Sequence, residues 1–143
     1  MKRPPIEVLR EGSAILDPLM SEHGFSFTDC RSGRGSGGPF AGGSYVNADR
    51  KLELHFRFSL GLVTYHFGEV SLDHEAYMRV VLGSEGGNKY PGFSDDPLDA
   101  FRDLAHDVQH FGNAFLEGDF KRFASYAAAA EQWKRIPGIA RLP

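Results

Sequence analysis

The chain has 143 residues, which is typical of one domain, and its hydrophobic content of 41%, with 12 phenylalanines, is enough to form a buried core. This composition excludes an intrinsically disordered chain. The formal net charge of −3 disfavours a nucleic-acid partner, because binding along a phosphate backbone depends on clustered lysine and arginine. We therefore expect a single domain over residues 1–143.

The cysteine content and the lack of long apolar segments predict the compartment. Cys30 is the only cysteine, so the chain cannot form an internal disulfide. The first residues show no apolar run with a small-residue cleavage site, and no run of about 18 consecutive apolar residues occurs. The sequence thus predicts a cytoplasmic protein that does not cross a membrane.

Residues 4–22 form the first predicted element. Apolar side chains recur at helical spacing after a Pro-Pro pair, a favourable helix start, and before a His-Gly pair, a favourable stop. Pro18 leaves two interpretations open, because an interior proline removes a backbone hydrogen bond. It lies either within one helix or at the start of a second short helix.

The segment up to residue 67 shows the alternation that is typical of strands. Residues 25–30 and 44–47 predict two short strands, and the glycine-rich tract Arg31–Gly43 between them predicts a loop. Residues 51–59 alternate strictly between polar and apolar side chains, as a strand with one buried face requires. A two-residue turn at 60–61 then predicts a hairpin.

This predicted hairpin has a defined register. It pairs Phe58 with Val63 and Phe56 with Tyr65, so that both strands bury the same face. An odd-length connection would turn one strand over, because successive side chains point to opposite faces.

The remaining elements are predicted to be helical. Residues 71–83 carry a helical pattern that ends at a glycine, and residues 84–95 predict a loop. A strong helix begins at Leu98, another follows Asp119, and residues 134–143 predict a tail. The order of elements predicts an α+β domain with an antiparallel meander of three to four strands packed against N-terminal and C-terminal helices.

Four polar residues are expected on the outer face of the hairpin, namely Glu53, His55, Arg57 and His66. The register places His55 opposite His66, and a histidine near a carboxylate titrates close to neutral pH, which suits acid-base chemistry. Exposed cross-strand polar pairs are also ordinary in sheets. The sequence shows no nucleophile in a recognisable elbow, so we assign no catalytic residue.

A second candidate site lies in the helix that begins at Leu98. His106 and His110 are four residues apart and share one helical face with Asp103, a spacing that permits zinc or another divalent transition metal to bind. The glutamate of the metalloprotease motif is missing. A small metal-binding protein or metal-dependent enzyme therefore stands as the alternative to a binding protein without a cofactor.

Aromatic residues in or beside the glycine-rich loops form the third candidate, and they are Phe40, Tyr45, Tyr90 and Phe93. Rings in loops are more often exposed than rings in strands, and exposed rings can anchor a protein interface. They can equally cover the ends of the core. Both interpretations stay open.

The layout of the chain also carries a resemblance. Its features are Gly24-Phe25 after the first helix, the hairpin from Leu54-His55-Phe56-Arg57 to Tyr65, and Tyr90-Pro91-Gly92-Phe93 before a helix that contains Asp99-Ala100-Phe101. In this arrangement the chain resembles small uncharacterised bacterial proteins, some of which look like immunity proteins of polymorphic toxin systems. The resemblance implies a non-enzymatic module that binds a protein partner, such as a toxin. A homo-oligomer formed through a sheet edge or the alanine-rich last helix is a further hypothesis.

Overall fold

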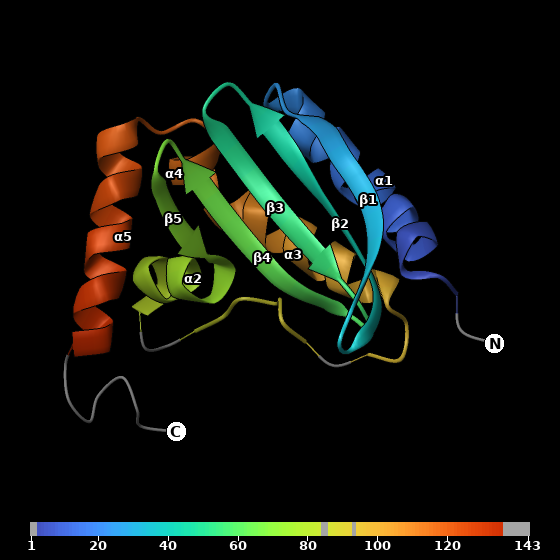
Figure 1. Cartoon of the computed structure of the whole chain (residues 1–143). Coiled ribbons are helices and arrows are strands. Elements are labelled where there is room, and N and C mark those ends of the chain that lie inside the picture. Colours follow the sequence, from blue (N-terminus) through green and yellow to red (C-terminus); the bar gives the residue numbers. More distant parts are fainter. Residues whose placement is uncertain (1–2, 84–85, 93, 136–143) are drawn as a thin grey trace.

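The computed structural model describes residues 3–83, 86–92 and 94–135. It shows a five-stranded antiparallel sheet with helices on one face (Figure 1). The strands are β1 (Ser26–Gly35), β2 (Gly38–Asn47), β3 (Arg50–Phe56), β4 (Leu60–Phe67) and β5 (Val70–Asp73), and their order in the sheet is their order in the chain. The helices are α1 (Pro5–Glu22), α2 (His74–Leu82), α3 (Leu98–Phe111), α4 (Asn113–Leu116) and α5 (Phe120–Arg135). The predicted α+β meander is confirmed, with five strands instead of three to four.

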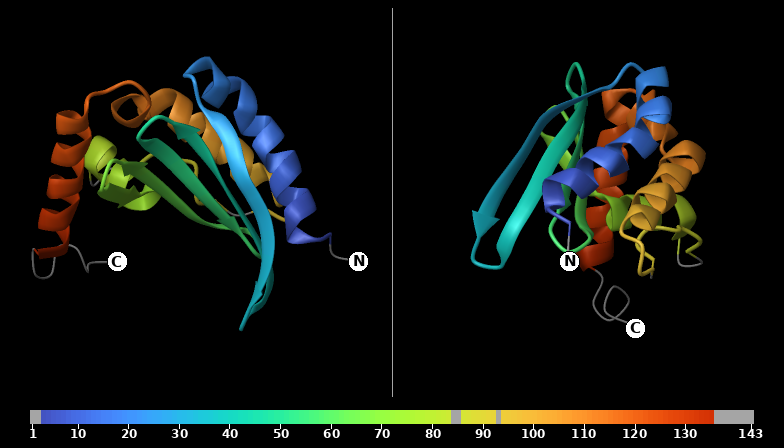
Figure 2. Two further views of the ribbon diagram at one scale, coloured as in Figure 1. Left: turned by 45° about the horizontal axis from the view of Figure 1, so that its top comes forward. Right: turned by 90° about the vertical axis from the view of Figure 1, so that its right-hand side faces the viewer.

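The helices are distributed unevenly around the sheet. In the right-hand view of Figure 2 the helices lie on one side of the sheet, and the opposite side is left uncovered by the described part of the chain. The core therefore lies between one face of the sheet and the helices, and it includes rings of Tyr65, Tyr77 and Phe115 that are no more than 1% exposed. A tail was expected over residues 134–143, but α5 continues to Arg135, and residues 136–143 lie outside the described residues.

Helix α1 is one continuous helix, and Pro18 lies inside it. Its buried face includes Leu9 and Leu16, which are both fully buried in the core. Gly12 lies on the same face and lets α1 approach α3 closely, because a Cβ atom at this position would lie 2.5 Å from the ring of Phe101. The helix ends at Glu22, directly before the expected stop at His23, whose N–H donates to the carbonyl of Met20 at 3.1 Å.

The glycine-rich tract is not a loop, and this prediction is wrong. Most of it belongs to β1 and β2, two ten-residue strands that are joined by a tight turn. The glycines weaken strand propensity, but they make room for large rings of the neighbouring strand. A Cβ atom at Gly43 would lie 2.5 Å from the Phe27 ring, and one at Gly33 would lie 2.7 Å from the Phe40 ring. Tertiary packing thus outweighs local propensity here.

The β3–β4 hairpin exists, but its predicted register is wrong by four residues, since Val63 pairs with Leu54 and not with Phe58. Leu54 pairs with Val63 and Phe56 pairs with Leu60, so the connection is residues 57–59 and not a two-residue turn at 60–61. A bulge next to Phe56 absorbs the odd length, so Leu60 remains buried. Phe58 is therefore a loop residue with 70% exposure, not a core residue.

Strand β5 occupies residues that were expected to be helical. Val70–Asp73 pairs with the second half of β4, and α2 begins only at His74. The helix starts there because the Asp73 carboxylate caps it, accepting a hydrogen bond from the N–H of Ala76 at 2.8 Å. Helix α2 ends at Leu82 and is followed by Gly83, whose φ of 69° is a backbone conformation that glycine adopts most readily.

The helix predicted from Leu98 is interrupted at Gly112. Helix α3 ends at Phe111, and the short α4 continues after the glycine in a new direction. A side chain at Gly112 would lie 2.5 Å from the carbonyl oxygen of Val108, so the close turn depends on glycine. The break brings the Phe115 carbonyl to Arg50 of β3, whose guanidinium donates to it at 2.9 Å.

Candidate functional site

The polar sheet face is present, although its members are arranged differently from the prediction. His66 pairs with Lys51 and His55 pairs with Leu62, so the two histidines are not opposite each other. His66 instead lies between Glu53, whose carboxylate is 2.8 Å from Nε2, and a serine of β5 whose hydroxyl is 2.9 Å from Nδ1. The imidazole of His66 therefore lies between a hydroxyl group and a carboxylate.

This serine, Ser71, was missed because its segment was expected to be helical. Ser71 is the direct cross-strand neighbour of His66. The three groups lie on the uncovered face of the sheet, where the Glu53 side chain is 45% exposed. Water therefore competes for each of these hydrogen bonds, and their contribution to stability is small.

His55 and Arg57 belong to a separate group around Phe40. The Phe40 ring stacks on the His55 ring with 5.1 Å between their centroids, and the Arg57 guanidinium lies 5.8 Å from the Phe40 centroid. The Nε atom of Arg57 is buried and has no hydrogen-bond partner among the described residues. The predicted cluster of four polar residues is therefore two separate clusters.

The predicted aromatic surface is mostly buried. Tyr45 and Tyr90 are 1% and 5% exposed, so they cover the core and are not available to a partner. The Tyr45 hydroxyl lies 2.6 Å from both the Ser13 carbonyl oxygen and Asp17 Oδ1, and the Tyr90 hydroxyl donates to the Leu60 carbonyl. Burial raises the pKa of Tyr90 to about 12. Phe40 is half-buried, and Phe93 lies outside the described residues.

His106 and His110 are neighbours on α3, and their ring centroids are 4.3 Å apart. One nitrogen of each ring already has a partner within the protein: His106 Nδ1 lies 3.2 Å from Asp107, and His110 Nδ1 donates to the His106 carbonyl. Within residues 3–83, 86–92 and 94–135, no group of three or more His, Cys, Asp and Glu side chains could hold a metal ion, so Asp103 does not complete the pair.

The most completely buried polar group in the core was not predicted from the sequence. His74 is 1% exposed and Asp107 is 0% exposed, and the imidazole Nε2 lies 3.1 Å from the carboxylate. On its other side, His74 Nδ1 lies 2.6 Å from the hydroxyl of Tyr65, which is also fully buried. With Nε2–H donating to Asp107, Nδ1 accepts the tyrosine proton, so each group in the row has a partner.

Asp107 connects this row to the segment that precedes α3. Its carboxylate accepts the N–H groups of Lys89 and Tyr90, each at 2.8 Å. Burial raises the pKa of Asp107, but the hydrogen bonds from His74 and from these two N–H groups outweigh it, and the pKa lies below its usual value. The row therefore joins β4, α2, α3 and the 86–92 segment, and its role is to hold these elements together.

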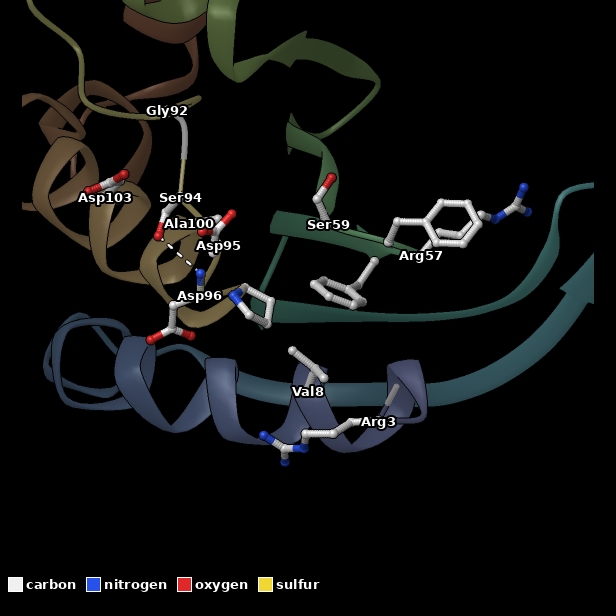
Figure 3. Close-up of a pocket in the computed structure, with 13 residues that line it drawn as sticks. Arg3, Val8, Arg57, Ser59, Gly92, Ser94, Asp95, Asp96, Ala100 and Asp103 are labelled. Atoms are coloured by element: carbon white, nitrogen blue, oxygen red, sulfur yellow. Dashed lines mark hydrogen bonds between the residues drawn. The ribbon is translucent and has the colours of Figure 1, made fainter. Parts of the chain in front are cut away.

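A cavity of about 450 Å³ lies at the end of the hairpin, between the β3–β4 loop, α1 and the start of α3 (Figure 3). Its volume falls within the range of about 300–1,000 Å³ that is typical of ligand pockets. The buried side chains of Val8 and Phe56 contribute apolar surface, and the exposed Phe58 contributes a third apolar side chain. The loop that holds Phe58 was not predicted, because the expected register placed this ring in the core.

Carboxylates lie along one side of this cavity. Figure 3 shows Asp95 and Asp103 on the same side, and neither carboxylate forms a hydrogen bond or an ion pair with another described residue. Their neighbour Asp96, in contrast, lies 3.3 Å from the Arg102 guanidinium, which also pairs with Asp99 at 2.5 Å. Two carboxylates beside an apolar surface are suited to binding a cation.

Comparison with models of protein families, with curated proteins and with solved structures finds no match to this chain. In the described part of the chain, no helix has both the length and the apolar character that crossing a membrane requires.

Proposed function

We propose that this protein is a non-enzymatic module that binds a protein partner through the end of the β3–β4 hairpin. The exposure of two large apolar side chains at this end carries the proposal. Phe58 is 70% exposed and Leu62 is 63% exposed, and the two lie in the loop and in the strand that follows it. Exposed aromatic and aliphatic side chains beside a concave, partly polar surface are typical of interface anchors.

A bacterial toxin is the partner that we favour, and the cytoplasm is the compartment. The resemblance of the turn residues to those of immunity proteins supports the choice of a toxin. The thiol of Cys30 is free, which suits a reducing environment. An immunity protein acts by occupying a surface of its toxin, and this requires a rigid exposed patch but no catalytic group.

Capture from the native host tests this function. The full chain, carrying an affinity tag, is expected to retain a stoichiometric protein partner. A double variant with Phe58→Asp and Leu62→Asp should lose it, because each substitution places a charge in the apolar contact. Phe120→Asp is the matched control. Among the described residues, Phe120 is the third large hydrophobic residue with high exposure, at 46%, and it packs against Phe67 at the opposite end of the hairpin.

Two results would contradict the proposal. One is the absence of a stoichiometric partner under every growth condition, and the other is equal loss of the partner with the hairpin variant and with the control. The toxin assignment has its own test, in which cells that lack this protein are exposed to the captured partner. Growth that continues unchanged would contradict a role in immunity.

A further inference from the structure

The cavity beside Phe58 combines an apolar surface with carboxylates that have no partner among the described residues. Val8 and Phe56 are each 3% exposed and form part of its wall. Asp95 is exposed and Asp103 is partly exposed, and both line the cavity without a hydrogen bond or ion pair to the described residues. A group that fills the cavity can therefore contact an apolar surface and a pair of negative charges at the same time.

The cations that line the cavity do not neutralise these two carboxylates. The guanidinium of Arg3 forms an ion pair with Glu11 of α1. The guanidinium of Arg57 is directed towards the β1–β2 turn, where a Cβ atom at Gly35 would lie 3.1 Å from it, and Figure 3 shows it far from Asp95 and Asp103. The electrostatic potential beside the two carboxylates is thus negative, which favours a positive ligand.

We propose that this cavity receives a lysine or arginine side chain from a basic segment of the partner. The methylene groups of that side chain contact Phe56 and Phe58, and its cation binds Asp95 and Asp103. A cation near the face of either ring gains further stabilisation. This inference rests on the proposed protein-binding function, and it adds the chemistry of the partner: a basic side chain supplies the contact at the centre of the interface.

The test uses two small probes that have nearly the same stem and differ in charge. Nα-acetyl-lysine methylamide is expected to shift the backbone amide signals of Asp95, Asp103 and Phe58 in NMR spectra of the full chain. Nα-acetyl-norleucine methylamide, which lacks the ammonium group, should bind about tenfold more weakly or not at all, since the loss of a charge-assisted contact is worth about one factor of ten in affinity. Added salt should weaken only the lysine probe.

Substitutions that keep the shape of the side chains complete the test. The double variant D95N/D103N should reduce the affinity for the lysine probe about tenfold. The control variant D49N removes one negative charge, as each of the two substitutions does, but in the exposed turn before β3. It should leave the affinity for the lysine probe unchanged. Equal binding of the two probes, or equal binding to D95N/D103N and to the wild type, would overturn the inference.

The same double variant separates this inference from the proposed function. One outcome is that the partner is lost with Phe58→Asp and Leu62→Asp but is retained in full by D95N/D103N. The protein-binding function then stands, and the inference that a basic side chain of the partner fills the cavity is wrong. If both double variants lose the partner, both proposals are supported. If no partner is found but the lysine probe binds as described, the function fails while the cation selectivity of the cavity stands.

Discussion

Two histidines in this protein each lie between a hydroxyl group and a carboxylate, and the two rows differ in burial. His74 lies between Tyr65 and Asp107, and none of the three is more than 1% exposed. His66 lies between Ser71 and Glu53, with its side chain 25% exposed and that of Glu53 45% exposed. The hydrogen-bond distances in the two rows are similar, between 2.6 and 3.1 Å.

The comparison indicates that solvent exposure, and not hydrogen-bond geometry, decides how much such a row contributes to the stability of the fold. In the buried row, removing one group leaves its partners without a hydrogen bond, and water cannot reach them to replace it. The free energy of unfolding then falls by the full desolvation cost of these partners. In the exposed row, water replaces whatever is removed, so the cost is small. The buried row should therefore hold the fold together, whereas the exposed row is free to be used or changed at the surface.

Asp107→Ala is expected to have the largest effect on this comparison. It leaves the imidazole of His74 and the N–H groups of Lys89 and Tyr90 without an acceptor. We expect a loss of about 3–5 kcal/mol in the free energy of unfolding, measured by urea denaturation, because a buried pair loses one partner. Asp103→Ala, one helical turn earlier, is the control and should change stability by no more than about 0.5 kcal/mol. Similar losses for both variants would contradict the special role of the buried row.

A smaller loss is expected on acidification, because protonation removes the charge of Asp107 but none of its atoms. The pKa of this carboxyl is lowered in the folded state. Its contribution is complete above the unfolded-state pKa of about 3.9, and it disappears as the pH falls through the lower folded-state value. Urea denaturation at pH values from about 5 downward should thus show a steeper decline for the wild type than for Asp107→Asn. Parallel declines would show that other carboxylates govern acid stability.

The smallest effect is expected for His66→Ala in the exposed row. Water can take over the hydrogen bonds of Ser71 and Glu53, so the free energy of unfolding should change by less than about 0.5 kcal/mol. The same denaturation measurement checks this value. A loss as large as that for Asp107→Ala would mean that the outer face of the sheet is covered in solution, for example by a second copy of the chain.

The sequence was most informative where the alternation is strict. Residues 51–56 of the predicted strand do form a strand. A period of two cannot distinguish registers that differ by an even number of residues, and the hairpin prediction was wrong by four residues for this reason. The error matters for the site, because the predicted register placed Phe58 in the core, whereas the structure exposes it at the surface. Strand β5, with four residues, is too short to show a period of its own, although the capping residue Asp73 signals that the helix starts after it.

The buried row was beyond sequence reasoning for a different physical reason. Asp107 lies three residues after Leu104 on the buried stripe of α3, and a charged residue on an apolar stripe is a signal that was overlooked. The hydrogen-bond partners of Asp107 could not be predicted, because two of them are backbone N–H groups of a segment with no regular structure. Such contacts depend on the tertiary fold, and no spacing in the sequence reveals them. The carboxylates of the cavity depend in the same way on where the β3–β4 loop lies.

The identity of strand order and chain order has a consequence for how the protein is made. During synthesis, each strand leaves the ribosome next to the strand with which it pairs, so the meander can assemble through short-range contacts. Helix α1 already contacts β1 and β2, but the apolar face of the sheet is not fully covered until α3 is made, whose Phe101 ring packs against Gly12 of α1. The interval between these two events is the period in which the nascent chain is most prone to aggregate and most dependent on chaperones.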